Sequence, residues 1–151
     1  IYSHSFCPSI SEVQYQFYNE EIALANAIGV GIQPFDKEVF YQRTSVLGQE
    51  YMGEGCDVPF DEEWEVGYGT GPFTIQNRYV TEDVPVGCHV YHELGKKFGV
   101  PTPIIDSMIV LGGVMNKTDY FESGLKLEDL GIGHMDKEAL LAYLNEGVYT
   151  E

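Results

Sequence analysis

Arg78 and Asp83 are the residues of this sequence whose types and spacing best suit chemistry. A guanidinium can hold a carboxylate through two parallel hydrogen bonds, which the point charge of lysine does not match. We expect Thr81 to be the N-cap of a helix, so the free N–H groups of its first turn would keep Asp83 ionised. An ionised carboxylate can orient a neighbouring imidazolium. The two residues could therefore serve one substrate cleft, or could be a salt bridge beside a helix-capping acid.

Three other clusters resemble sites but lack a defining element. Cys88 and His92 are one helical turn apart, but no second Cys or His pair has a matching spacing, so we assign them no metal. The run at 67–72 ends in Pro72 where a dinucleotide fingerprint needs glycine, which predicts a flexible or substrate-covering loop. The acidic cluster at 57–65 has no EF-hand spacing and is typical of a solvated face.

Composition excludes several classes of function. The 151 residues carry a net charge of −16, and such a surface repels nucleic acid and anionic membranes, so we expect neither as a partner. The longest apolar stretch, at 104–115, is too short to span a bilayer. Three cysteines are too few for a disulfide framework, which predicts a cytoplasmic protein. Because the first residue is Ile1, we expect the chain to be a piece of a larger protein.

The elements that must position these residues are helical. Apolar residues recur at three- and four-residue steps, and convincing alternating strands are absent. We therefore predict an all-α, compact domain over residues 1–151 with about five or six helices. The apolar helix that follows Thr102 and Pro103 should lie at its centre. The predicted segments are helices at 9–28, 36–51, 81–98, 103–115 and 136–147, a turn or short helix at 125–132, and a Gly- and acid-rich loop at about 53–77.

Several of these segments together resemble the carboxy-terminal helical domain of the octopine/nopaline (opine) dehydrogenases. The resemblance covers about residues 18 to 132, and its motifs fall in the order found in that family. The matching runs are Glu20-Glu21-Ile22-Ala23-Leu24-Ala25, Ala27-Ile28-Gly29-Val30, Arg78-Tyr79-Val80-Thr81-Glu82-Asp83-Val84-Pro85, Glu93-Leu94-Gly95, Gly99-Val100-Pro101-Thr102-Pro103, Ile105-Asp106 and Leu127-Glu128-Asp129-Leu130-Gly131.

The resemblance implies an enzyme that reductively condenses an amino acid with a 2-oxo acid such as pyruvate, using NAD or NADP. It implies that Arg78 binds a substrate carboxylate and that Asp83 is the catalytic partner of a histidine. It also implies a Rossmann domain that binds the nucleotide. We expect that domain and the histidine, which the family carries in a His-Pro motif, to lie upstream of this chain. The chain alone should then be inactive, and a homodimer is an open alternative for its assembly.

Two other hypotheses compete with this one. The chain could be the substrate domain of another two-domain NAD(P)-dependent reductase, of the ketopantoate reductase or 3-hydroxyacid dehydrogenase type. It could instead be a non-catalytic helical interaction module. The Arg-x4-Asp spacing that ends at Asp83 and the run Gly99 to Pro103 favour the opine enzymes. A Gly-x-Gly-x-x-Gly strand-turn-helix upstream in the gene would argue against the module.

Overall fold

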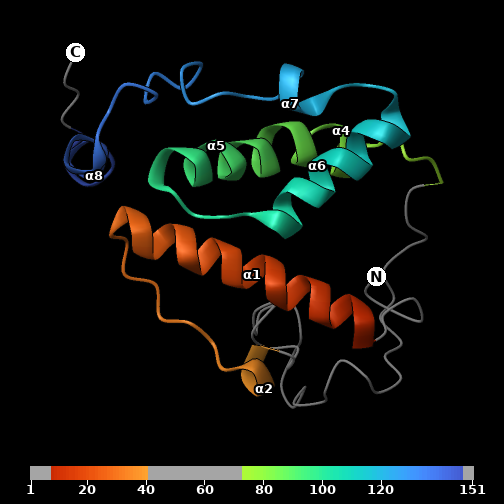
Figure 1. Cartoon of the computed structure of the whole chain (residues 1–151), viewed down its shortest axis with the longest axis horizontal. Helices are drawn as coiled ribbons and strands as arrows, with labels where there is room; N and C mark the ends of the chain where they lie inside the picture. Colours follow the sequence, from red (N-terminus) through yellow and green to blue (C-terminus); the bar gives the residue numbers. More distant parts are fainter. Residues whose placement is uncertain (1–7, 41–72, 148–151) are drawn as a thin grey trace. The chain divides into compact units, whose positions relative to one another are not determined.

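The computed structural model describes residues 8–40 and 73–147 of the chain, and these fall into two compact units. The first unit contains described residues 8–18 and 33–40, and the second contains 19–32 and 73–147. The single domain predicted over residues 1–151 stays a prediction. Figure 1 shows helices joined by turns, and no strand occurs in the described ranges, so the predicted all-α class is confirmed.

The described helices begin and end at residues that the sequence largely marks. They are α1 (Pro8–Ile28), α2 (Lys37–Phe40), α4 (Arg78–Thr81), the π-helix η2 (Asp83–Cys88), α5 (His89–Phe98), α6 (Pro103–Asn116), α7 (Tyr120–Ser123) and α8 (Lys137–Glu146). Only the start of the helix predicted at 36–51 is described. Most of the loop predicted at 53–77 also lies outside the described residues, as do the acidic cluster at 57–65 and the run at 67–72.

Glycines and one aspartate set the helix ends as predicted. Gly29 ends α1 at a φ of +95°, and Gly99 and Gly147 end α5 and α8 at +70°. Left-handed values of this kind cost glycine little because it has no Cβ. The Asp136 carboxylate accepts the N–H of Ala139 at 2.9 Å and so caps α8. These local signals therefore fix where α1 and α5 end and where α8 begins and ends.

The first unit is organised by aromatic contacts between the start of α1 and the segment that includes α2. The Phe40 ring stacks on Tyr18 with centroids 4.9 Å apart, and Phe40 is buried. The backbone N–H of Phe35 donates to the Tyr18 hydroxyl at 2.8 Å. Lys37 adds an ion pair with Glu12 at 2.7 Å.

The helix that carries Arg78 starts earlier than predicted. The Asn77 side chain accepts the N–H of Tyr79 and caps α4, whereas Thr81 lies inside the helix and donates its hydroxyl to the Asn77 carbonyl at 3.2 Å. The prediction that Thr81 is the N-cap is therefore wrong. Asp83 follows a completed helical turn and begins η2. Pro85 lies inside η2, and proline inside a helix removes a donor and distorts the helix, which fits the π-helical turn found here.

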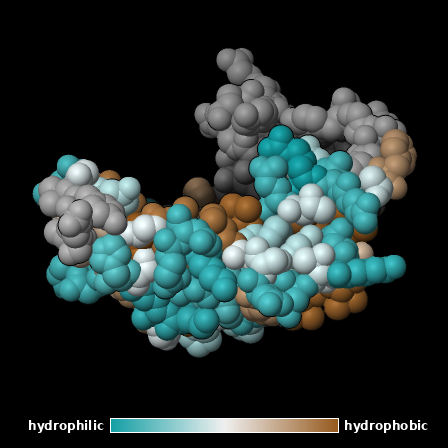
Figure 2. Space-filling view, turned by 90° about the horizontal axis from the view of Figure 1, so that it is seen from above, coloured by the Kyte–Doolittle hydropathy of each residue, from teal (hydrophilic) through white to brown (hydrophobic). Residues whose placement is uncertain are grey.

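α6 is buried along one side only. Ile105 and Ile109 have exposed fractions of 0% and 1%, whereas Leu111 and Val114 have 56% and 72%. One side of α6 therefore packs in the core, as predicted for a central helix, whereas its opposite side is exposed. In Figure 2, hydrophobic patches interrupt the hydrophilic surface of the visible face. Among the described helices, none is long and apolar enough to cross a membrane.

A second apolar cluster joins the end of α1 to α8. Ile28, Met135 and Leu140 are buried together, and Leu94 and Phe98 of α5 pack against them. The polar end of the same contact is the Lys137 ammonium, which donates to the Ala27 carbonyl at 2.9 Å. Residues near the start and near the end of the second unit's sequence are thus in direct contact.

Candidate active site

Arg78 is the first residue of α4, and its guanidinium faces solvent. The side chain is 72% exposed, and its ion pair with Glu82, one turn further on, has an N–O distance of 3.6 Å. An exposed pair of this length contributes about 0–1 kcal/mol, so an incoming carboxylate can displace it. Arg78 is thus held in place through its backbone while its charge stays available.

Asp83 begins η2 one helical turn after Arg78, and its side chain is exposed. Within the described ranges, its carboxylate makes no hydrogen bond or ion pair, with Arg78 or with any other residue. The salt bridge considered between Arg78 and Asp83 is therefore not formed, because Arg78 pairs with Glu82 instead. Arg78 therefore has only this weak, exposed ion pair, and Asp83 has no side-chain partner within the described ranges.

η2 packs closely against α6. A Cβ added to Gly112 would lie 3.0 Å from a methyl carbon of Val84, the residue after Asp83. Val84 and Gly112 therefore pack closely, and a side chain at position 112 would require Val84 to shift. This contact places the turn that carries Asp83 on the same buried side of α6 as Ile105 and Ile109.

A half-buried titratable cluster lies beside Asp83. Burial, reinforced by the negative charges of Asp83 and Glu21, raises the pKa of the Cys88 thiol to about 11. Burial likewise raises the pKa of Glu21, a shift that its hydrogen bond with Tyr91 opposes. Burial and this bond to Glu21 raise the pKa of Tyr91 to about 12. Cys88 is therefore a protonated, poorly nucleophilic thiol at neutral pH.

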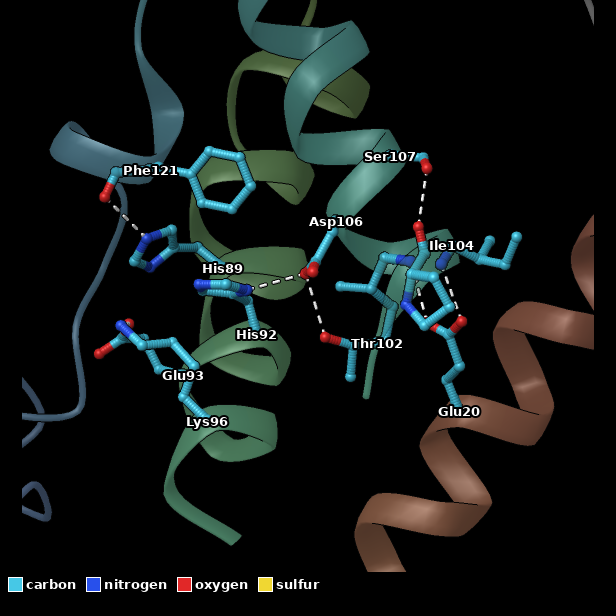
Figure 3. A network of polar contacts seen from close by, with 12 residues as sticks. Glu20, His89, His92, Glu93, Lys96, Thr102, Ile104, Asp106, Ser107 and Phe121 are labelled. Carbon is cyan, nitrogen blue, oxygen red and sulfur yellow. Dashed lines mark hydrogen bonds and ion pairs between the residues drawn. The ribbon is translucent and has the colours of Figure 1, made fainter. Parts of the chain in front are cut away.

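His92 belongs to a polar network that links α5 to α6 (Figure 3). Its Nδ1 donates to Asp106 Oδ1 at 2.8 Å, and the Thr102 hydroxyl donates to the same oxygen at 3.0 Å. Next to this network, both oxygens of the buried Glu20 accept the backbone N–H groups of Ile104 and Ile105. Glu20 thus caps the start of α6, whereas the side chain of the N-cap residue Thr102 makes no cap hydrogen bond and is turned to Asp106.

Cys88 and His92 belong to no cluster of possible metal ligands within the described ranges. His92 is engaged with Asp106, and no group of three His, Cys, Asp or Glu residues within the described ranges could hold a metal ion. The neighbouring His89 is 1% exposed and both of its ring nitrogens face backbone carbonyls. The histidines of α5 therefore have structural partners.

A pocket of about 410 Å³ lies where α6 ends and α7 begins, and its lining includes Ile109, Val114, Lys117 and Tyr120. Neither Arg78 nor Asp83 lines it. The two residues that the sequence singles out are therefore placed on an exposed helical segment outside this pocket.

Sequence reasoning missed the partners that support this segment. His92 and Asp106 are 14 positions apart, and Glu20 is 84 positions from Ile104. No local spacing rule connects such residues. The burial of Glu20 points to such partners, since a buried carboxylate must find donors, but this burial is known only from the structure.

The first 116 residues match the model of a protein family described as "NAD/NADP octopine/nopaline dehydrogenase, alpha-helical domain". One relative is an opine dehydrogenase from Arthrobacter sp. (strain 1C), which is 28% identical over 134 residues. The aligned part covers 87% of this chain but 35% of the relative, so the chain spans about a third of that protein's length. The helical fold agrees with the family's description. The chain therefore belongs to the NAD/NADP octopine/nopaline dehydrogenase family and corresponds to its alpha-helical domain.

Proposed function

We propose that this chain is the substrate-binding domain of an NAD(P)-dependent opine dehydrogenase that reductively condenses an amino acid with a 2-oxo acid such as pyruvate. The observation that carries the proposal is the pair of exposed charges on one helical segment. Arg78 is held only by a weak pair with Glu82, and Asp83 has no side-chain partner among the described residues. A structural salt bridge would bring these groups together instead.

The two residues take different roles in this reaction. Arg78 binds a substrate carboxylate, since both the amino acid and the 2-oxo acid carry one, and a planar guanidinium fits it with two hydrogen bonds. Asp83 accepts a hydrogen bond from a histidine contributed by another part of the full-length protein. A carboxylate in that place fixes the tautomer of the ring and stabilises its protonated form, so that the imidazole can act as acid and base near neutral pH.

The described residues do not fit the nucleotide. A dinucleotide site needs a strand that leads through a glycine-rich turn into a helix, and the described ranges contain no strand. We therefore place NAD or NADP on a Rossmann domain elsewhere in the full-length protein and derive no step of hydride transfer from this chain.

The net charge bears on which macromolecular partners the chain can have. With a net charge of −16, the chain is suited to neither nucleic acid nor an anionic membrane surface, and we propose a cytoplasmic enzyme with small-molecule substrates. We keep the homodimer as a hypothesis for the oligomeric state.

The proposal is tested by NADH and NADPH oxidation with the full-length protein. Each reaction contains one amino acid from a panel and pyruvate or a related 2-oxo acid, and matched reactions contain only one of the two substrates. Oxidation that needs both, with a secondary amine dicarboxylate as product by mass spectrometry, is the expected result. Oxidation with the 2-oxo acid alone would indicate a hydroxyacid dehydrogenase instead. No oxidation with any pair would favour a non-catalytic module.

A further inference from the structure

The π-helix η2 is held by a hydrogen bond from outside the helix. The Pro85 carbonyl accepts the backbone N–H of Leu125 at 2.8 Å. Pro85 itself has no N–H with which to close a helical turn, and no side chain caps the start of η2. The bond from Leu125 therefore adds a restraint from outside η2 to the hydrogen bonds that the helix makes internally.

His89 holds the segment that provides this bond. Its ring is buried, with Nδ1 2.9 Å from the Leu125 carbonyl oxygen and Nε2 3.2 Å from that of Phe121. Figure 3 shows the His89 ring beside the segment of Phe121. Carbonyl oxygens only accept, and a neutral imidazole has one N–H, so the shorter distance favours donation to Leu125. Leu125 is thus bonded through its carbonyl to His89 and through its N–H to Pro85.

The packing leaves this arrangement little freedom. A Cβ at Gly124 would lie 2.4 Å from the Cγ of His89, so the segment rests directly on the ring. On the α6 side, a Cβ at Gly112 would lie 3.0 Å from Val84. η2 is therefore restrained by Leu125 through its backbone and by α6 through close contact.

We infer that His89 is a positioning residue for the reaction: by holding Leu125 it fixes η2, and with it the direction of the Asp83 carboxylate. The inference rests on the proposed role of Asp83. Asp83 has no side-chain partner among the described residues, so within them only the backbone of η2 determines where its side chain starts and which way its Cα–Cβ bond points. A histidine from another part of the protein needs that direction to be constant, because an error of about 1 Å in a catalytic contact can cost about 100-fold in rate.

Three variants of the full-length protein test this inference. His89→Leu fills the site with an apolar side chain and removes the ring nitrogens that face the two carbonyls. His89→Asn retains a donor near the place of Nδ1, and His89→Gln retains one near the place of Nε2. Each variant is compared with the unaltered enzyme by hydrogen–deuterium exchange of the peptides around 83–89 and 121–126, and by separate kcat and KM values.

We expect His89→Leu to speed exchange in both peptides and to lower kcat by about 10- to 100-fold. The KM for the 2-oxo acid should change less than about twofold, because Arg78 is positioned by the Asn77 cap upstream of η2. His89→Asn should restore most of kcat and His89→Gln less of it. Faster exchange with unchanged kcat, or unchanged exchange around 83–89, would overturn the inference.

A second pair of variants covers the case in which His89→Leu does not fold. Gly112→Ala pushes on Val84 and should lower kcat several-fold, whereas Gly31→Ala, which lies outside η2 and whose Cβ would meet nothing within 4 Å, should leave kcat unchanged. Equal kcat values in these two variants would count against control of Asp83 by η2. Absence of condensation by the unaltered enzyme would overturn the proposed function, while the exchange data would still show whether His89 restrains η2.

Discussion

The Glu20 carboxylate accepts the backbone N–H of Ile105 at 3.0 Å, and its other oxygen accepts that of Ile104 at 2.8 Å. Two of the N–H groups that a helix leaves unpaired at its start are thus paired by a buried side chain from α1. The contact stabilises both partners, since the start of α6 provides donors and a positive dipole end for the anion.

Glu20→Gln should lower the free energy of unfolding by about 1.5–3 kcal/mol. The glutamine amide keeps one acceptor oxygen, but its NH₂ group then faces a backbone donor. Urea unfolding followed by far-ultraviolet circular dichroism measures the change. Glu146→Gln, on the exposed last residue of α8, is the control and should shift the midpoint very little. Equal midpoints for the two variants would contradict this role of Glu20.

Arg78→Lys should raise the KM for one substrate by tens of fold. The reason is the loss of a bidentate hydrogen bond to a carboxylate, which contributes about 1.5–3 kcal/mol. Steady-state kinetics of the full-length enzyme measure the effect for the amino acid and the 2-oxo acid separately. Glu82→Gln, which removes only the exposed ion pair of Arg78, should leave both KM values close to those of the unaltered enzyme. Unchanged kinetics in Arg78→Lys would remove Arg78 from the site.

Asp83→Asn should lower kcat by about 100-fold or more while changing stability by less than about 0.5 kcal/mol. The amide cannot stabilise an imidazolium, and an exposed side chain without described partners contributes little to folding. Turnover is measured as kcat at saturating substrate, and stability as the thermal unfolding midpoint of the same preparation. Full activity in this variant would leave Asp83 as a surface acid.

The Cys88 thiol should react slowly with iodoacetamide at pH 7. Its pKa of about 11 leaves a very small thiolate fraction, and this fraction should rise about tenfold per pH unit until the pH approaches that value. A Cys7→Ser, Cys56→Ser background isolates the reaction. Adding Asp83→Asn removes one of the charges that raise this pKa, so alkylation should become faster. Fast alkylation at pH 7 without that change would argue against the buried environment of Cys88.

Glu21→Gln should alter the pH dependence of stability. Burial raises the pKa of Glu21 above 4.5 in the folded chain, so the folded state holds this proton to higher pH than the unfolded state does. The stabilising contribution is therefore complete below pH 4.5 and is lost as pH rises through the folded value. The stability of Glu21→Gln relative to the unaltered chain should increase from pH 4 to pH 7 in urea unfolding. A difference that is constant over this range would show that the Glu21 proton does not contribute.

Local signals in the sequence predicted the helices well. The glycine stops at Gly29, Gly99 and Gly147 and the Asp136 cap depend on neighbouring residues only, so they can be recognised without a structure. The start of α4 could not be placed in the same way. Asn77 and Thr81 are both good caps, and Pro85 marks a first turn about as well as it marks a distorted one.

The candidate site shows the same division. Arg78 and Asp83 were predicted from residue type, spacing and the family resemblance, and their roles stay predictions. The contacts among His89, Leu125 and Pro85 join residues that are 36 or more positions apart. Such contacts depend on how the helices pack, and the sequence pattern of any one helix contains no information about them.

The bond from Lys137 to the Ala27 carbonyl joins residues 110 positions apart, and this separation bears on how the chain folds during synthesis. The ribosome makes α1 before α8. At about 5–20 residues per second, the end of α1 waits on the order of 5–20 s for its lysine. During that time Ile28 also lacks Met135 and Leu140 as apolar neighbours. The nascent chain should therefore bind chaperones through the end of α1 until residues 135–140 leave the exit tunnel.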